Sequence, residues 1–522
     1  MKHAAQPRAA RTRPRSSPRP AGAQRSRRRT RGILVALALL VALALGGYAF
    51  AARWLLSGPR LRSWINTSPQ TTLVEWDEAV SRWPGVVGLK NFRVRGSDAN
   101  VEWELRLSEA RARFSVAALL SRTFRVERVA GTGLSFRLRQ KVDRGDPKRP
   151  PTEVLPPIEG FSDPPLRRPE APASAPGGGH PWTVDVGGIA IDRFDEIWVD
   201  AYRFEGSARL HGRFQLKPGQ RARIGPAAID FGEGALRVGG QILMSKLEGR
   251  LHATFAQWDP RLVQGAAVWR QVDAEIDLHG PSPGLEYLNY YLRRDREPRF
   301  SGGRGTLSVT GSVEHGIASG RVRLAADDAR VKRPGVELSG DLHAEVRLPR
   351  WDLEASAIDL SGSSLQLSDV AAAGAEDTRG WWGKFDLAPA HLRDGFDARV
   401  ALHCRDARPL LAVLGVGLPK WTRGLLTLEG LKADADVLLA PSRTRVHALE
   451  ASGGDFHILG EYARRPGAES GAFLVESGVL RIGVGTGDGG AGVHLLAPHG
   501  WYERTSADIA QTSREDRRVG RK

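Results

Sequence analysis

Residues 485 to 490, GTGDGG, have the G-x-G-x-x-G spacing of a dinucleotide-binding loop. That fingerprint binds a pyrophosphate where a strand leads into a helix, because the helix N-terminus receives the phosphates. Here VLRIGVG precedes the glycines and AGVHLLA follows them, and both runs alternate in the manner of strands. The sequence therefore predicts a glycine-rich hairpin turn at this position and not a dinucleotide site.

Other residue types that could support catalysis are scattered along the chain. The sequence contains no H-E-x-x-H, no G-x-S-x-G and no Walker A lysine. Most strand-like runs that contain a histidine contain only one, as at His211, His252, His279, His343 and His403. We therefore predict that the protein is not an enzyme and has no cofactor and no metal site. An exported enzyme such as a glycosidase is kept as an alternative.

The chain has a single cysteine, Cys404, in the strand-like run ARVALHC. One cysteine excludes an intrachain disulfide and a thiolate metal cluster. We predict that Cys404 is a small buried apolar residue and not a nucleophile.

The positive charge is concentrated at the N-terminus. Residues 1–31 carry eleven Lys and Arg, and the first acid of the 522-residue chain is Glu75. Subtracting these eleven from the formal net charge of +17 leaves +6 for the remainder, which contains all 59 acids. Such a balanced body is not typical of a nucleic-acid-binding protein, so no nucleic acid is expected as a partner.

Residues 32–52, GILVALALLVALALGGYAFAA, contain no charge. At about 1.5 Å per residue this run is long enough to cross a hydrocarbon core of about 30 Å. The sequence thus predicts a transmembrane helix that keeps 1–31 as a basic cytoplasmic tail and places the remainder on the far side. Alternatively, the run is a signal peptide cleaved after Ala51, since Ala49-Phe50-Ala51 is an A-x-A site.

Beyond the membrane segment the chain reads as strand after strand. Val101, Trp103, Leu105 and Leu107 alternate with polar residues, and the alternation shifts by one near Ser108, which predicts a bulge. Similar runs recur every eight to fourteen residues with Gly or Asp at the breaks. We divide the chain into an N-terminal β segment (53–139), a Pro/Gly-rich linker or loop (140–181), a β body (182–502) and a disordered charged tail (503–522).

So many one-sided strands need something to cover their apolar side. Several β-sandwich domains would do so, but each normally takes roughly 100 residues with boundaries of its own. We favour a mainly β protein with an N-terminal transmembrane helix, an elongated, curled antiparallel β-sheet groove and a few short helices. Roughly 25 strands at about 4.8 Å would give a groove on the order of 100 Å long.

The order of these features is similar to that of the AsmA-like family of envelope proteins, which are related to TamB and to bridge-type lipid transporters. The pattern is carried by WPGVVGLKNFRVRG, by Ala118-Leu119-Leu120-Ser121 and by the strands from Phe124 to Arg139. The C-terminal order PKWTRGLLTLEGLKADADV, GDFHILGEY and GAFLVESGVLRIGV is also similar. The resemblance implies a chorein-like start, a single-pass inner-membrane anchor with a periplasmic body, and a role in phospholipid transport or outer-membrane homeostasis and biogenesis.

We therefore expect a membrane-anchored periplasmic protein that binds phospholipid acyl chains, with a possible periplasmic or outer-membrane protein partner. The alternative is a non-transporting envelope scaffold of β-sandwich domains that binds a protein. The candidate lipid-binding residues share an apolar type on alternating strand positions of the N-terminal segment; they are Val101, Trp103, Leu105, Leu107, Phe114, Phe124, Val126, Leu134, Phe136 and Leu138.

Overall fold

The computed structural model describes part of 43–66, then 72–98, 100–143, 154–167, 183–217, 221–259, 262–263, 265–292, 298–333, 336–372, 380–393, 395–409, 429–487 and 490–519. Residues 32–42 of the predicted membrane helix lie outside these ranges. Within them, no helix is both long enough and apolar enough to span a membrane.

All the described strands belong to one sheet of 25 strands. The first half comprises β1 (Thr72–Glu75), β2 (Glu78–Trp83), β3 (Val86–Ser97), β4 (Val101–Phe114), β5 (Thr123–Gln140), β6 (Thr183–Ile191), β7 (Phe194–Val199), β8 (Tyr202–Lys217), β9 (Arg221–Val238), β10 (Gln241–Met244), β11 (Glu248–Trp258) and β12 (Val272–Ser282). The second half comprises β13 (Arg299–Glu314), β14 (Ile317–Arg333), β15 (Val336–Asp352), β16 (Ala357–Asp359), β17 (Ser364–Ala372), β18 (Trp381–Leu392), β19 (Phe396–Cys404), β20 (Leu431–Ala440), β21 (Arg443–Gly453), β22 (Phe456–Arg465), β23 (Ala468–Ser477), β24 (Leu480–Gly487) and β25 (Gly490–His494).

Helices are short and peripheral in the described part of the chain, apart from the last one. Besides the helical residues described between 43 and 56, they are α2 (Pro59–Ile65), α3 (Val116–Leu119), the 3-10 helices η2 (Gly265–Gln271) and η3 (Glu286–Tyr290), and α5 (Pro498–Val519). The protein is therefore mainly β with few helices, as predicted.

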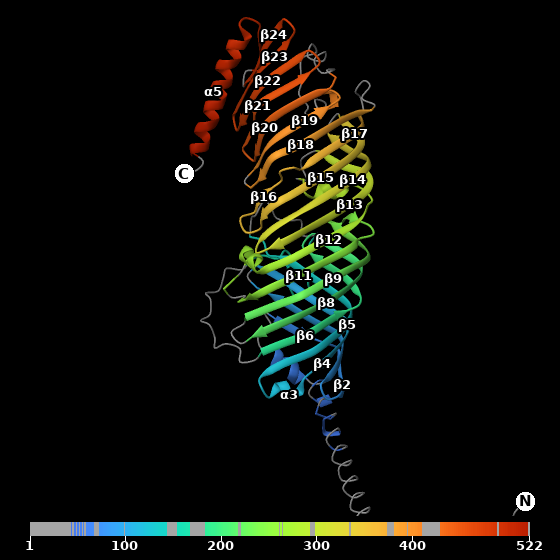
Figure 1. Cartoon of the computed structure of the whole chain (residues 1–522). Helices are drawn as coiled ribbons and strands as arrows, with labels where there is room; N and C mark the ends of the chain where they lie inside the picture. Colours follow the sequence, from blue (N-terminus) through green and yellow to red (C-terminus); the bar gives the residue numbers. More distant parts are fainter. Residues whose placement is uncertain are drawn as a thin grey trace, which may run out of the picture.

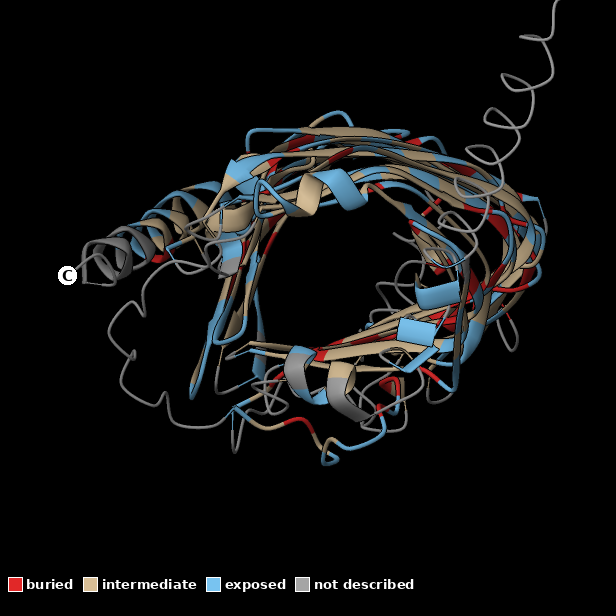
Figure 2. Cartoon of the chain, turned by 90° about the horizontal axis from the view of Figure 1, so that it is seen from below, coloured by how far each residue is buried: buried red, intermediate tan, exposed pale blue. Residues whose placement is uncertain are grey.

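Strands that follow one another in the chain mostly pair in antiparallel register, so the sheet grows by successive hairpins from β1 to β25. The sheet is elongated in Figure 1. Seen along its length in Figure 2, it curves round into a wall that closes most of a ring. This is the large curled sheet that the strand pattern predicted. The separate β-sandwich domains of the alternative prediction are not found, because every described strand is hydrogen-bonded into the same sheet.

One junction departs from the predicted antiparallel arrangement. Strand β5 pairs in parallel with β6, from Thr123↔Thr183 onwards, and with β7, from Leu134↔Phe194 onwards. Parallel neighbours require a long crossover connection, and the chain between β5 and β6 supplies it. The segment 140–181, predicted to be a linker or loop, thus connects strands that pair within the same sheet. We call it the crossover.

The segment 503–522, predicted to be a disordered tail, is instead helical up to Val519 as part of α5. This helix packs against β22, β23 and β24 (Figure 1). Trp501 stacks on His494 with ring centroids 4.1 Å apart, and Ile509 is buried. The polar composition of α5 hid this packing, because only a few apolar side chains anchor the helix.

Candidate functional site

The predicted lipid-binding residues of β4 and β5 face one another across the two strands. Trp103 pairs with Leu138, Leu105 with Phe136, and Leu107 with Leu134. Leu107 and Leu134 are buried, whereas the other four side chains are only half-buried. The structure therefore brings six of the ten predicted residues together into one apolar surface.

The remaining four candidates lie toward the two ends of these strands. Phe114 pairs with Val126 and stacks on Phe124 at a ring-centroid distance of 6.2 Å. Val126 is buried, but Phe124 is 43% exposed. Val101 pairs with Gln140 at the opposite end. These residues continue the apolar surface without adding to its centre.

The alternation of apolar positions does shift near Ser108, but not through the predicted bulge. The pairs Leu107↔Leu134 and Glu109↔Thr132 keep the same register on both sides of Ser108. Its neighbours in the row across the sheet, Asn91 and Gly133, instead have positive φ angles of 49° and 70°. These two left-handed residues flank Ser108, and on β4 both Leu107 and Ala110 belong to the same apolar cluster.

This cluster extends well beyond the N-terminal segment. It includes Phe194 of β7, Phe204 of β8 and Leu307 of β13, together with half-buried residues as far as β14. Phe204 and Phe231 contact each other edge to face, with ring centroids 5.0 Å apart. One side of the sheet is thus a continuous apolar face, which we call the apolar face.

The exposure of the side chains leads us to assign the apolar face to the inside of the curl. On a curved sheet, side chains on the convex side splay apart into solvent, whereas those on the concave side crowd together. In β14, Arg321 and Arg323 are exposed, while Val322 and Leu324 on the other side are half-buried. In β8, His211 is exposed and Leu210 is half-buried. The apolar side chains are therefore shielded by curvature, yet many are not fully covered by protein.

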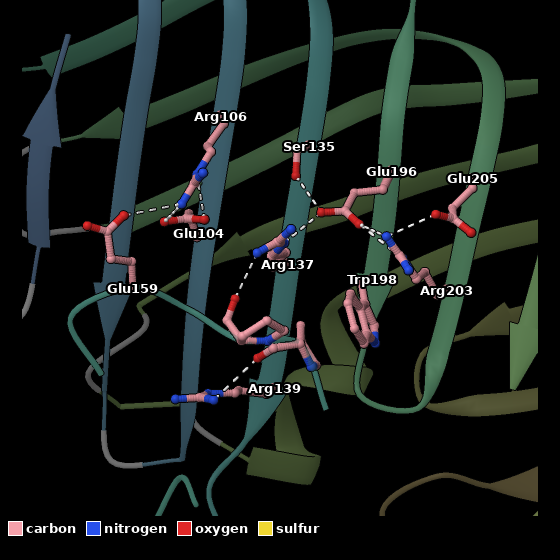
Figure 3. Close-up of polar contacts among 12 residues, drawn as sticks. Glu104, Arg106, Ser135, Arg137, Arg139, Glu159, Glu196, Trp198, Arg203 and Glu205 are labelled. Carbon is pink, nitrogen blue, oxygen red and sulfur yellow. Dashed lines mark hydrogen bonds and ion pairs between the residues drawn. The ribbon is translucent and has the colours of Figure 1, made fainter. Parts of the chain in front are cut away.

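The opposite, charged face carries an ion-pair network that the sequence analysis did not identify (Figure 3). Arg93 and Arg106 bind Glu104, which is buried between them. On the next strands Glu196 accepts from Arg137 at 2.6 Å and from Arg203 at 2.9 Å. The signal was present in the sequence, because acids on β4 lie opposite arginines on β5, as in the pair Glu102↔Arg139.

The network borders a polar depression of about 690 Å³. Four of the arginines that line it, Arg93, Arg106, Arg137 and Arg203, are paired with carboxylates, whereas Arg62 donates to the carbonyl of Trp76. Much of its positive charge is therefore compensated. Burial raises the pKa of Glu196, but hydrogen bonds from Arg137 and Ser135 more than offset this, and the net pKa is lowered. Glu196 therefore stays ionised, and the arrangement fits a structural role better than proton transfer.

Arg139 connects this face to the crossover. Its guanidinium is fully buried, pairs with Glu102 at 2.9 Å and also binds Asp163 of the crossover. It donates further hydrogen bonds to the carbonyls of Pro156 and Ser162. Leu155 and Ile158, which belong to the same part of the crossover as Pro156, are also buried. Arg93 also binds the Glu159 carboxylate, and Arg95 and Arg137 donate to the carbonyls of Glu159 and Pro157. Arg139 is thus the buried member of a group of arginines that anchor the crossover to the sheet.

The positions that could have carried chemistry are structural in this fold. Residues 485–490 join β24 to β25 by a hairpin with the pair Gly487↔Gly490, which confirms the predicted turn. Cys404 is buried at the end of β19, as predicted, and burial raises the pKa of its thiol to about 11. Within the described ranges, no three His, Cys, Asp or Glu side chains are grouped so as to hold a metal ion.

Comparison with known proteins gives no relative. No protein-family model, no curated protein and no solved structure matches this chain. Function is therefore inferred from the geometry of the sheet.

Proposed function

We propose that the protein is a membrane-anchored, periplasmic lipid-binding protein of the AsmA-like kind, in which the inside of the curled sheet holds phospholipid acyl chains. The observation that carries the proposal is the apolar face itself. It runs across strands β3 to β14 as one cluster, in which buried side chains such as Phe204 are surrounded by partly buried ones such as Leu105 and Val322. The described strands form no second sheet over it.

The free energy of burying apolar side chains favours binding of an apolar ligand on this face. Leaving a large apolar side chain in water costs about 1.5–3 kcal/mol relative to burying it. Trp103, Leu105, Phe136, Leu138 and their equivalents on later strands repeat that cost many times along the sheet. Acyl chains are the apolar filler that a membrane supplies, and a stack of strands at about 4.8 Å spacing offers them a continuous path.

The charged face explains how such a protein stays soluble outside the bilayer. Exposed residues such as Arg209, Arg321 and Arg323 alternate with the apolar positions of β8 and β14. Only the inside of the curl would need lipid. Phospholipid movement between membranes, with the predicted helix 32–52 in the inner membrane, follows as the proposed role.

The first test is lipid content. The full chain, purified in detergent, is expected to carry phospholipid that mass spectrometry detects after organic extraction. The single variants Phe136→Asp and Leu210→Asp each place a charge on the apolar face. Each is expected to abolish the retention of phospholipid. His211→Asp is the matched control, because His211 is next to Leu210 on β8 but points to the charged face.

A folded chain that carries no lipid would reject the lipid proposal and favour the scaffold alternative. The same holds if His211→Asp loses as much lipid as Leu210→Asp, since retention would then not depend on the apolar face. Circular dichroism of each variant shows whether the sheet is intact.

A further inference from the structure

We infer that the end of the sheet nearest the predicted membrane helix 32–52 docks directly on the lipid bilayer through two apolar turns. This inference rests on the proposed function, because it assumes that the chain stands on a membrane. The first turn joins β2 to β3 and begins at Trp83. The second contains α3 and continues to Leu120. We call them the proximal turns.

The proximal turns expose large apolar side chains. Leu120 is 92% exposed, Trp83 63% and Val116 48%. Phe124, just after the second turn, and Val80, just before the first, are also exposed. Isolated exposed apolar residues need no explanation, but a group of them at one tip of a molecule indicates an interaction surface.

The two turns form one surface. The backbone amide of Phe114 donates to the carbonyl of Gly85 at 2.7 Å. A Cβ placed on Gly85 would lie 3.8 Å from a methyl carbon of Val116. The Ser115 side chain caps α3 by accepting from the amide of Ala118. The apolar tips are therefore held side by side by hydrogen bonds and close packing.

The predicted membrane segment reaches the same place. The hydroxyl of Tyr48 lies 2.6 Å from that of Ser81 and donates to the carbonyl of Trp83 at 3.2 Å. In Figure 1, β2 and α3 lie at the end of the sheet opposite β24 and α5. A bilayer crossed by 32–52 would thus lie at the end of the sheet that carries the proximal turns, away from β24 and α5.

The charged residues around the proximal turns indicate what the turns bind. Arg122 and Arg128 are exposed beside them, and Arg113 and Arg125 are exposed even though they pair with Glu127 and Asp185. Tryptophan and arginine around apolar tips are typical of the membrane interface, where aromatic rings sit at head-group depth and basic residues attract anionic lipid. A bilayer containing anionic phospholipid is therefore the occupant that we assign.

The test measures how deeply two matched positions of the full chain lie in a lipid bilayer. Leu120 and Leu496 are both 92% exposed but belong to opposite ends of the sheet. Each is changed to Cys and labelled with an environment-sensitive fluorophore. The native Cys404 is buried with a raised thiol pKa, so the parent chain should remain unlabelled.

The labelled proteins are reconstituted into phosphatidylcholine vesicles that contain phosphatidylglycerol and doxyl-labelled lipid. The Leu120→Cys probe is expected to shift to the blue and to be quenched, because interfacial apolar groups reach about 5–10 Å into the bilayer. The Leu496→Cys probe is expected to remain in water and unquenched.

Equal quenching at both positions, or none at either, would overturn the docking inference. A blue shift at Leu120→Cys without quenching by doxyl lipid would also overturn it, since the tip would then be covered by protein. Failure of the proposed function is separate: it appears as loss of co-purified lipid and does not alter the depth of the Leu120→Cys probe.

Discussion

Gly96 and Trp103 show at the residue scale how the apolar face is built. The two residues pair across β3 and β4, and a Cβ on Gly96 would lie only 2.5 Å from the indole ring. The ring therefore lies flat over the glycine and spreads along the face. Phe204 uses Gly234 in the same way, with a corresponding distance of 2.5 Å. Glycine on these strands thus makes room for an aromatic ring on a neighbouring strand.

This geometry gives a prediction for stability. Gly96→Ala should lower the free energy of unfolding by about 1–3 kcal/mol, the usual cost of overpacking, because the indole of Trp103 must move. Gly88→Ala on the same strand is the control, since a Cβ there would meet only the carbonyl of Val80 at an ordinary 3.8 Å. Urea denaturation followed by tryptophan fluorescence measures both. Equal effects at the two positions would show that the ring is not seated on Gly96.

At the scale of elements, the crossover between β5 and β6 departs most from what the pattern indicated. Its composition is that of a linker, rich in proline and glycine. Its described part nevertheless contains the buried residues Leu155, Pro156 and Ile158. It covers the charged face because the parallel pairing of β5 forces the chain to return along the sheet. No periodicity in the segment itself could reveal this.

Arg139 should therefore be a point of weakness for this element. Arg139→Ala removes the 2.9 Å ion pair of the buried Glu102 and leaves it with Lys141 at 3.9 Å. Breaking a buried ion pair by removing one partner typically costs about 3–5 kcal/mol. Arg113→Ala is the control, because its ion pair with Glu127 is exposed and should contribute about 1 kcal/mol or less.

Thermal unfolding measures the loss of stability in both variants. Trypsin cleavage near Arg167 reports release of the crossover, which is expected only for Arg139→Ala. Resistance of the Arg139→Ala crossover to trypsin would mean that its other contacts, such as those of Arg93 and Arg137, are enough to hold it.

At the scale of the whole molecule, continuous hydrogen bonding makes the chain one long sheet. Each strand is hydrogen-bonded to its neighbours, and α5 packs against the last strands, where Trp501 lies over Gly483 and Gly485. The exposed edge of β25 and the apolar residues Leu495 and Leu496 mark the distal end.

Limited proteolysis is expected to give one large core with trimmed ends and nicked loops that stays associated in size-exclusion chromatography. A ladder of separable stable fragments of roughly 100 residues is the result that a chain of independent sandwich domains would give. Such a ladder would contradict the continuous sheet.

The sequence alone determined the features that follow from the alternation of apolar and polar residues along a strand. These are the mainly β class, the apolar positions of β4 and β5, the hairpin at 485–490 and the buried Cys404. These follow from local rules, because a strand alternates its side chains whatever its partners are. Only the tertiary structure decided that β5 pairs in parallel, that Arg139 anchors the crossover and that α5 packs on the sheet. Those features depend on contacts between segments far apart in the chain, and such contacts leave little periodic trace in the sequence.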